Sequence, residues 1–284
     1  MISAGTPPLR TLRYHLGKGD RTASELIWDF ATQNDGKADV MPSLVLDLET
    51  TVDDVRADGS ARLRIRVVKS NVRGGAAGSG SAASSDLARS EAVALQGVTI
   101  GETLAPDGAV SDVKIDAPPG LPAAVTARLE ALGRGLSQAA MRLPSAPVGA
   151  TASWRERKTL PEGGIRAVSE ATYTLSALTD TTVTYEAQAT SSGPAQTIEQ
   201  DGVKVEITDT HGQAETRGTV DLAHYAPQVH ARSSFATTMN VAAPADAPGA
   251  GKSTIAITMA LELAPTALAA SPPDKDSDKE PDKN

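Results

Sequence analysis

Alternation of apolar and polar side chains, repeated along most of the chain, is the feature that most constrains its fold. Five segments show it: Leu44–Val55, Leu63–Val72, Ala171–Ala189, Val203–Ile207 and Ile255–Leu263. Successive side chains of a β-strand point to opposite faces, so each segment predicts a strand with one buried and one hydrated face. Such strands are typical of antiparallel sheets. We therefore expect a mainly β fold, a large, curved, half-barrel-like antiparallel sheet, rather than an array of β-α-β units.

The joints between the predicted strands carry hairpin signals. Four dipeptides provide them: Asp58-Gly59, Asp107-Gly108, Gly163-Gly164 and Thr179-Asp180. Glycine supplies the positive φ that tight hairpin turns need, and aspartate favours the turn. We expect about ten to twelve strands, most of them paired with their neighbours in sequence as a meander.

One segment has the period of a helix instead. After Pro118-Pro119-Gly120, apolar residues recur at spacings of three and four, at Val125, Leu129, Leu132, Leu136, Ala139 and Leu143. This stripe predicts one amphipathic helix at about 121–143, packed on the sheet, or alternatively covering a hydrophobic cavity. A shorter helix is expected at 86–95.

Length and composition fit a single β domain followed by a tail. The chain has 284 residues, 40% of them hydrophobic, which is enough to bury a core. We expect residues 1–263 to form one antiparallel β domain, with a flexible Gly/Ser/Ala insert at 74–85. Residues 264–284 are rich in proline and alternating charges, which cannot bury surface, so this charged tail is expected to be disordered.

Charge and cysteine content exclude several classes of function. The formal net charge is -8, which argues against nucleic acid as a partner. The chain has no cysteine, so disulfides, thiolate metal ligands and cysteine nucleophiles are excluded. No apolar run approaches the ~20 residues of a membrane-spanning helix. The first ten residues lack the basic and apolar regions of a signal peptide, so the protein is either cytoplasmic or numbered from after an export signal.

The motifs that suggest chemistry are each incomplete. Gly249–Thr254 resembles the end of a phosphate-binding loop, but Asp246 stands where that loop needs glycine, and a strand follows instead of a helix. His224 and His230 are six residues apart, and nothing completes a metal site around Asp221 and His224. His211-Gly212 is expected to be a turn between two strands.

Other candidate groups also lack a second component. Asp53 and Asp54 should point to opposite faces of a strand. Glu199 and Asp201 lie near a predicted turn, and no serine occupies a nucleophile elbow. We therefore predict no catalytic, cofactor-binding or metal-binding residues, no cofactor and no enzymatic activity.

Aromatic and basic side chains leave two alternatives open. Trp28 and Phe30 share one strand face, and with Trp154 they are expected in the core, or alternatively at a pocket mouth. Arg62, Arg64 and Arg66 form a basic stripe on one face of a strand. The stripe is expected to be a hydrated face neutralised by acids of a neighbouring strand, or alternatively a recognition edge for an acidic partner.

The layout of two strand meanders, Leu44–Val72 and Ala171–Leu263, around a predicted helix resembles bacterial envelope lipoproteins of the open β-barrel type. These include outer-membrane lipoprotein carriers and mycobacterial lipid-binding lipoproteins. The resemblance covers most of residues 10–263 and is one of architecture, so it implies no residue role. It implies a curved sheet whose concave face can hold an acyl chain, and a periplasmic or cell-envelope location. Association with a membrane would then require a lipid anchor outside this sequence.

Two functions follow as expectations. The first is a non-enzymatic envelope protein that binds a lipid, another hydrophobic ligand or another envelope protein. The second is a structural or protein-interaction β domain with no ligand cavity, acting through a sheet face or edge.

Overall fold

The computed structural model describes residues 1–74, 82–121, 126, 129–130, 133, 140–162, 165–200, 203–241 and 251–268. Its named elements, in chain order, are β1 (Thr6–Arg10), β2 (Arg21–Asn34), β3 (Lys37–Val40), β4 (Ser43–Val55), β5 (Ala61–Arg73), α1 (Ala82–Leu95), β6 (Thr99–Leu104), β7 (Val110–Asp116), β8 (Val148–Ala150), β9 (Ser153–Glu162), β10 (Ile165–Leu178), β11 (Thr182–Gly193), β12 (Gln196–Gln200), β13 (Val203–Asp221), β14 (Gln228–Val241) and β15 (Gly251–Thr266). The predicted tail is outside the described residues from position 269 onward.

A single 13-stranded sheet dominates the described part of the chain, which confirms the predicted fold class. Its order is β7-β6-β5-β4-β2-β15-β14-β13-β11-β10-β9, with β12 paired to β13, β3 paired to β2, and a separate β1-β8 pair. Every pairing is antiparallel, and most join neighbours in sequence, as a meander requires. Two pairings join strands far apart in the chain. One is β1 with β8, and the other is β2 with β15, which brings Trp28 opposite Leu261 and joins the two meanders.

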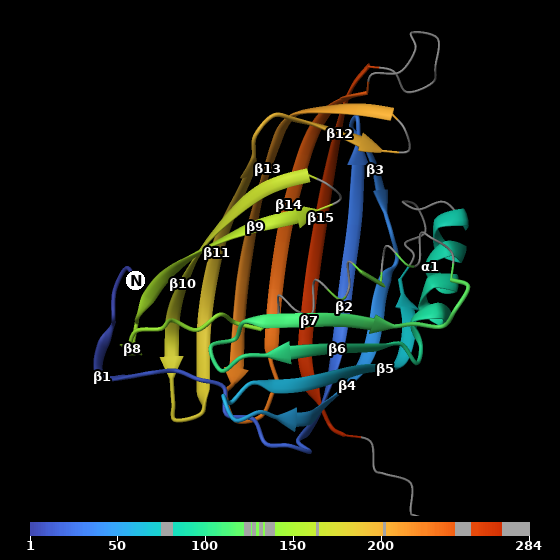
Figure 1. Ribbon diagram of the computed structural model, residues 1–284. Helices are drawn as coiled ribbons and strands as arrows, with labels where there is room; N and C mark the ends of the chain where they lie inside the picture. The colour runs from blue at the N-terminus through green and yellow to red at the C-terminus, as the bar shows by residue number, and fades with distance from the viewer. Residues whose placement is uncertain are drawn as a thin grey trace, which may run out of the picture.

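The sheet is folded over so that its two ends share a core. One cluster of buried side chains combines Leu63 and Leu104, from β5 and β6, with Leu175 and Tyr185, from β10 and β11. Figure 1 shows both ends of the sheet in front of the long middle strands β14, β15 and β2. The inner face of the sheet is therefore concave, and alternate residues of each strand point into it.

Two irregular segments close one end of this concave face. Leu12 and Tyr14, in the segment between β1 and β2, are buried in the same cluster as Met141 and Leu143, which precede β8. The Tyr14 backbone N–H donates to the Pro106 carbonyl at 2.8 Å, and the Tyr14 hydroxyl donates to the Met141 carbonyl at 3.3 Å. Large side chains and backbone hydrogen bonds therefore seal this end.

Three of the four dipeptides that predicted hairpins lie in turns of the described residues. Gly59 and Gly108 have φ of 81° and 82°, the left-handed region that glycine tolerates. At the third turn, the Thr179 hydroxyl accepts the Thr182 N–H at 3.0 Å. Gly163-Gly164 lies outside the described residues, between the paired strands β9 and β10.

The helical predictions have different outcomes along the chain. α1 confirms the shorter helix, but it starts at Ala82 and therefore includes the last part of the predicted insert. Of the longer helix, Thr126, Leu129, Glu130 and Gly133 are helical, and most of the remainder lies outside the described residues. Leu129 is buried among inner-face residues of the sheet, as the predicted packing requires. Residues 140–143 are not helical.

Candidate functional site

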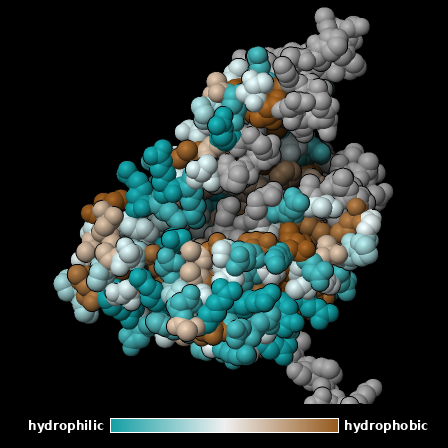
Figure 2. Space-filling model, viewed as in Figure 1, coloured by the Kyte–Doolittle hydropathy of each residue, from teal (hydrophilic) through white to brown (hydrophobic). Residues whose placement is uncertain are grey.

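The inner face is hollow over β10, β11, β13 and β14. A cavity of about 230 Å³ lies there, lined by Met141, by Thr190, Gln213 and Ser234, and by inward-facing residues of β9–β11 and β13–β15: Glu156, Lys158, Ser169, Ala171, Tyr173, Tyr185, Ala187, Ala189, Ser191, Ala214, Thr216, Ser233, Phe235 and Met259. Figure 2 shows the molecule hollowed between β9 and the front strands β6 and β7, which Figure 1 labels in the same view. The volume is slightly below the ~300–1,000 Å³ of small-molecule sites, so the cavity suits a small ligand or one chain of a larger one.

Small side chains in register create this space. Ala171 lies opposite Ala189, Ala189 opposite Ala214, and Ala214 opposite Ser233, so one row of small residues crosses four strands. At the far end of the row, Ser233 lies opposite Met259 of β15. The backbone ladder is continuous under the cavity, and the hollow comes from side-chain size alone.

Gly212 corrects one prediction. His211-Gly212 is not a turn but lies inside β13, whose strand continues through it. A Cβ on Gly212 would lie 3.0 Å from Cδ2 of Phe235 and 2.5 Å from Oγ of Ser191. Glycine is therefore required here by the close approach of side chains on the two flanking strands, and the turn-forming tendency of the dipeptide is overridden.

One edge of the cavity carries a charged pair on β9. Nζ of Lys158 lies 3.3 Å from Oε2 of Glu156, and the Tyr173 hydroxyl donates to the same oxygen at 3.2 Å. The Glu156 side chain is 15% exposed and that of Lys158 is 43% exposed. The carboxylate is thus held by two donors, whereas the ammonium reaches solvent and has further N–H groups to offer.

All four tyrosines of the chain gather in the core beside the cavity. Trp154 stacks on Tyr173 with ring centroids 5.4 Å apart, Tyr173 lies 6.0 Å from Tyr185, and Tyr14 lies 6.4 Å from Tyr225. Burial raises the pKa of Tyr185 to about 12 and raises the pKa of each of the other three tyrosines well above its ordinary value. The hydroxyls therefore stay protonated well above neutral pH, and those of Tyr14 and Tyr173 donate hydrogen bonds to the Met141 carbonyl and the Glu156 carboxylate.

Glu102 is a buried acid that sequence analysis missed. It is 1% exposed and follows Ile100 on the inner face of β6, in a position where alternation favours an apolar residue. Its charge contributes to the raised pKa of Tyr225. The sequence signal was a lone acid at an inward position, which short-range alternation cannot distinguish from an irregularity in the strand.

A pair of buried threonine hydroxyls lies on the same face, one row beyond Phe235. Thr210 and Thr237 are directly opposite each other on β13 and β14, and both are almost fully buried. Neither Oγ1 has a hydrogen-bond partner among the described residues. A second threonine pair, Thr184 and Thr219, differs because its hydroxyl oxygens lie 3.2 Å apart and share a hydrogen bond.

The aromatic and basic residues singled out from the sequence divide between the inner and outer faces. Trp154 is buried, as expected. Trp28 and Phe30 are half-buried, pack edge to face at 6.4 Å, and line a small hollow of about 20 Å³ beside α1. Arg64 pairs with Asp53 at 2.8 Å, so this arginine of the basic stripe is neutralised by a neighbouring strand.

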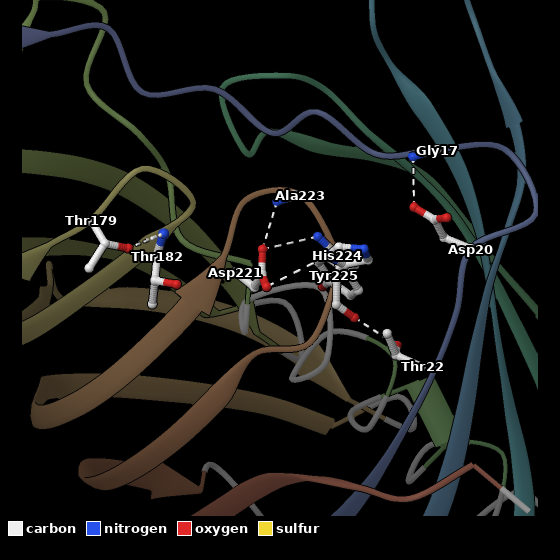
Figure 3. A network of polar contacts seen from close by, with 9 residues as sticks. All are labelled: Gly17, Asp20, Thr22, Thr179, Thr182, Asp221, Ala223, His224 and Tyr225. Carbon is white, nitrogen blue, oxygen red and sulfur yellow. Dashed lines mark hydrogen bonds and ion pairs between the residues drawn. The ribbon is translucent and has the colours of Figure 1, made fainter.

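The acids and histidines do not converge. Asp54 pairs with Lys18 at 3.2 Å, away from Asp53, and the Lys18 ammonium lowers the pKa of Asp54. Asp221 caps a turn, because its Oδ1 accepts the backbone N–H groups of Ala223 and His224 at 2.8 and 3.1 Å (Figure 3). Within the described ranges, no group of three or more His, Cys, Asp or Glu side chains could hold a metal ion.

The string Gly249–Thr254, which resembles part of a phosphate-binding loop, lies partly within the described residues. Residues 251–254 belong to β15, so they do not open a helix, and the two residues before them are outside the described residues. In the part of the chain that the structure describes, no helix has the length and apolar character to cross a bilayer.

Comparison of the sequence with protein-family models and with curated proteins found no match.

Proposed function

We propose that the protein is a non-enzymatic binder of a lipid-like hydrophobic ligand, held on the concave face of its sheet. The observation that carries the proposal is the cavity of about 230 Å³, where inward-facing alanines and serines replace the large side chains that fill the rest of that face. The lining combines apolar side chains, such as Phe235 and Met259, with serine and threonine hydroxyls. Concave sites that join apolar surface to hydrogen-bonding groups are typical of small-molecule binding.

The lining supports binding rather than catalysis. Its described acid and base, Glu156 and Lys158, are paired with each other, and the hydroxyls of Tyr173 and Tyr185 are held protonated by burial. The apolar part of the lining, which includes Phe235 and Met259, suits a hydrocarbon chain. The resemblance of the layout to open-barrel envelope lipoproteins supports a location in the cell envelope as part of the same proposal.

The alternative function is a protein-interaction domain that uses the outer face of the sheet. Two shallow hollows of about 440 and 300 Å³ lie over β11–β15 and share outward-facing Gln213, Ser234 and Thr258. The side chains of Gln213, Ser234 and Thr258 offer hydrogen-bonding groups to a protein surface laid over these hollows. This alternative predicts that the protein takes up no lipid.

The test fills the cavity from the inside and uses the outer face as control. Ala214→Trp places an indole in the hollow, whereas Glu215→Trp adds the same group to the exposed side of the same strand. The affinity for a fluorescent fatty acid should fall at least about tenfold in Ala214→Trp, a loss of about 1.4 kcal/mol of binding free energy. The affinity should stay unchanged in Glu215→Trp. Circular dichroism checks that both variants fold.

A second readout uses the protein as purified. Solvent extraction and mass spectrometry should recover a lipid from the wild type and less of it from Ala214→Trp. A wild-type protein that carries no lipid and takes up no fluorescent fatty acid would overturn the proposal and favour the interaction domain.

A further inference from the structure

The charged side chains at the edge of the cavity indicate which end of a ligand binds there. We infer that Lys158 binds the anionic carboxylate head group of a single-chain amphiphile whose hydrocarbon tail lies along the row of small residues toward β15. This inference rests on the proposed function and adds to it the head group, the residue that binds it and the direction of the tail.

Lys158 is the cation among the described residues that line the cavity. It lies opposite Ser169, and Ser169 lies opposite Ser191, so one ammonium and two hydroxyl donors occupy neighbouring positions on the inner face. Beside its contact with Glu156, the Lys158 ammonium has further N–H groups, and together with the two hydroxyls these can donate to a head group with a single negative charge.

Glu156 and Tyr173 position the ammonium. Glu156 precedes Lys158 by two residues on the inner side of β9, and the Tyr173 hydroxyl fixes the Glu156 carboxylate at 3.2 Å. Because burial and the neighbouring carboxylate both raise the pKa of Tyr173, this donor persists at neutral pH. Glu156 consequently keeps Lys158 at the cavity edge and also competes with an incoming carboxylate for the ammonium.

The tail direction follows from the strand register. The row starts on β9 at Glu156, which lies opposite Ala171, and Lys158 lies two residues further along β9, beside this start. From there the row runs through Ala171, Ala189 and Ala214 and reaches Ser233 and then Met259. Five strand spacings of about 4.8 Å separate β9 from β15, so the path measured along the curved sheet is roughly 24 Å. The row changes from charged to apolar along this path, as a single-chain amphiphile does.

The experiment compares three probes of equal chain length by isothermal titration calorimetry: dodecanoate, dodecanol and dodecyltrimethylammonium. The wild type should bind dodecanoate more tightly than dodecanol, and the ammonium probe most weakly. Lys158→Gln should weaken dodecanoate about tenfold and leave dodecanol unchanged. The control Arg157→Gln removes the same charge from the adjacent, outward-facing residue of β9 and should leave all three affinities unchanged.

Glu156→Gln gives the result that a merely structural role would not produce. Glutamine keeps an acceptor for the Tyr173 hydroxyl but no longer competes for Lys158, so dodecanoate should bind about threefold or more tightly. A weaker affinity for dodecanoate in this variant would contradict the competition between Glu156 and the ligand carboxylate for Lys158.

The remaining outcomes separate the two proposals. If dodecanol and dodecanoate bind equally and Lys158→Gln changes neither affinity, the head-group inference is wrong and the proposed function stands. If none of the three probes binds the wild type, both are wrong.

Discussion

On strand β11, Val183 and Ala189 point to the same inner face, yet they lie in different surroundings. Val183 is buried in a core that includes Leu175 and Val220, whereas Ala189 borders the cavity and is half-buried. The pairing of β11 with β13 continues unbroken past both residues. The filled and the hollow regions of this face therefore differ in the size of their side chains and not in their backbone.

Alkaline pH should have the largest effect, because it acts on the tyrosines that pack the filled region. Their pKa values are raised in the folded state, that of Tyr185 to about 12, so folding is favoured fully below the unfolded value near 10 and less as pH rises beyond it. At pH 11 ionisation of the four tyrosines in the unfolded chain should lower the free energy of unfolding by roughly 5.6 kcal/mol, about 1.4 kcal/mol each.

Urea unfolding from pH 8 to 11 measures this loss, and the ultraviolet absorbance of tyrosinate reports ionisation. Tyr185→Phe removes one titrating group, so the slope of the free energy of unfolding against pH should fall by the contribution of about one proton. Native protein whose tyrosines ionise near pH 10 would show that they are not held in an apolar core.

Truncation of one large side chain in each region tests the comparison directly. Leu175→Ala, in the filled region, should lower the free energy of unfolding by about 2–5 kcal/mol, because it leaves a cavity in packed surroundings. Met259→Ala, beside the existing hollow, should lower it by about 1 kcal/mol. Equal losses in urea unfolding would mean that the two regions are packed alike.

Substitutions in the two threonine pairs should change the free energy of unfolding least. The direction of the change distinguishes a hydroxyl with a hydrogen-bond partner from one without. Thr210→Val or Thr237→Val removes a buried hydroxyl that lacks a partner and should raise the free energy of unfolding by about 1 kcal/mol. Thr184→Val breaks the hydrogen bond to Thr219 and should lower it by about 1 kcal/mol. Thermal unfolding followed by circular dichroism measures both, and a loss of stability in the first two variants would show that their hydroxyls have partners.

Local features of this fold could be predicted from the sequence. The alternation of Ile257, Met259 and Leu261 identified one face of β15, and the cavity lining places Met259 on the inner one. The turns at Gly59 and Gly108 followed from a dipeptide whose conformation depends on adjacent residues. Each of these signals is contained within a few positions of the chain.

The candidate site could not be predicted in the same way, because it depends on strand order. Tyr14, Tyr173, Tyr185 and Tyr225 come from four separate segments, and only folding brings them together. The pairing of β2 with β15 joins residues more than 200 positions apart, with Ser253 donating to Asn34 as one example. The small residues of the hollow read as ordinary inward positions until the register aligns them.

The end strands β7 and β9 are not joined to each other in the described sheet. In a closed barrel the number and stagger of the strands determine the interior width, whereas here the interior has an unjoined seam along one side. The width of the interior is therefore determined by the twist and coiling of the sheet and not by ring closure.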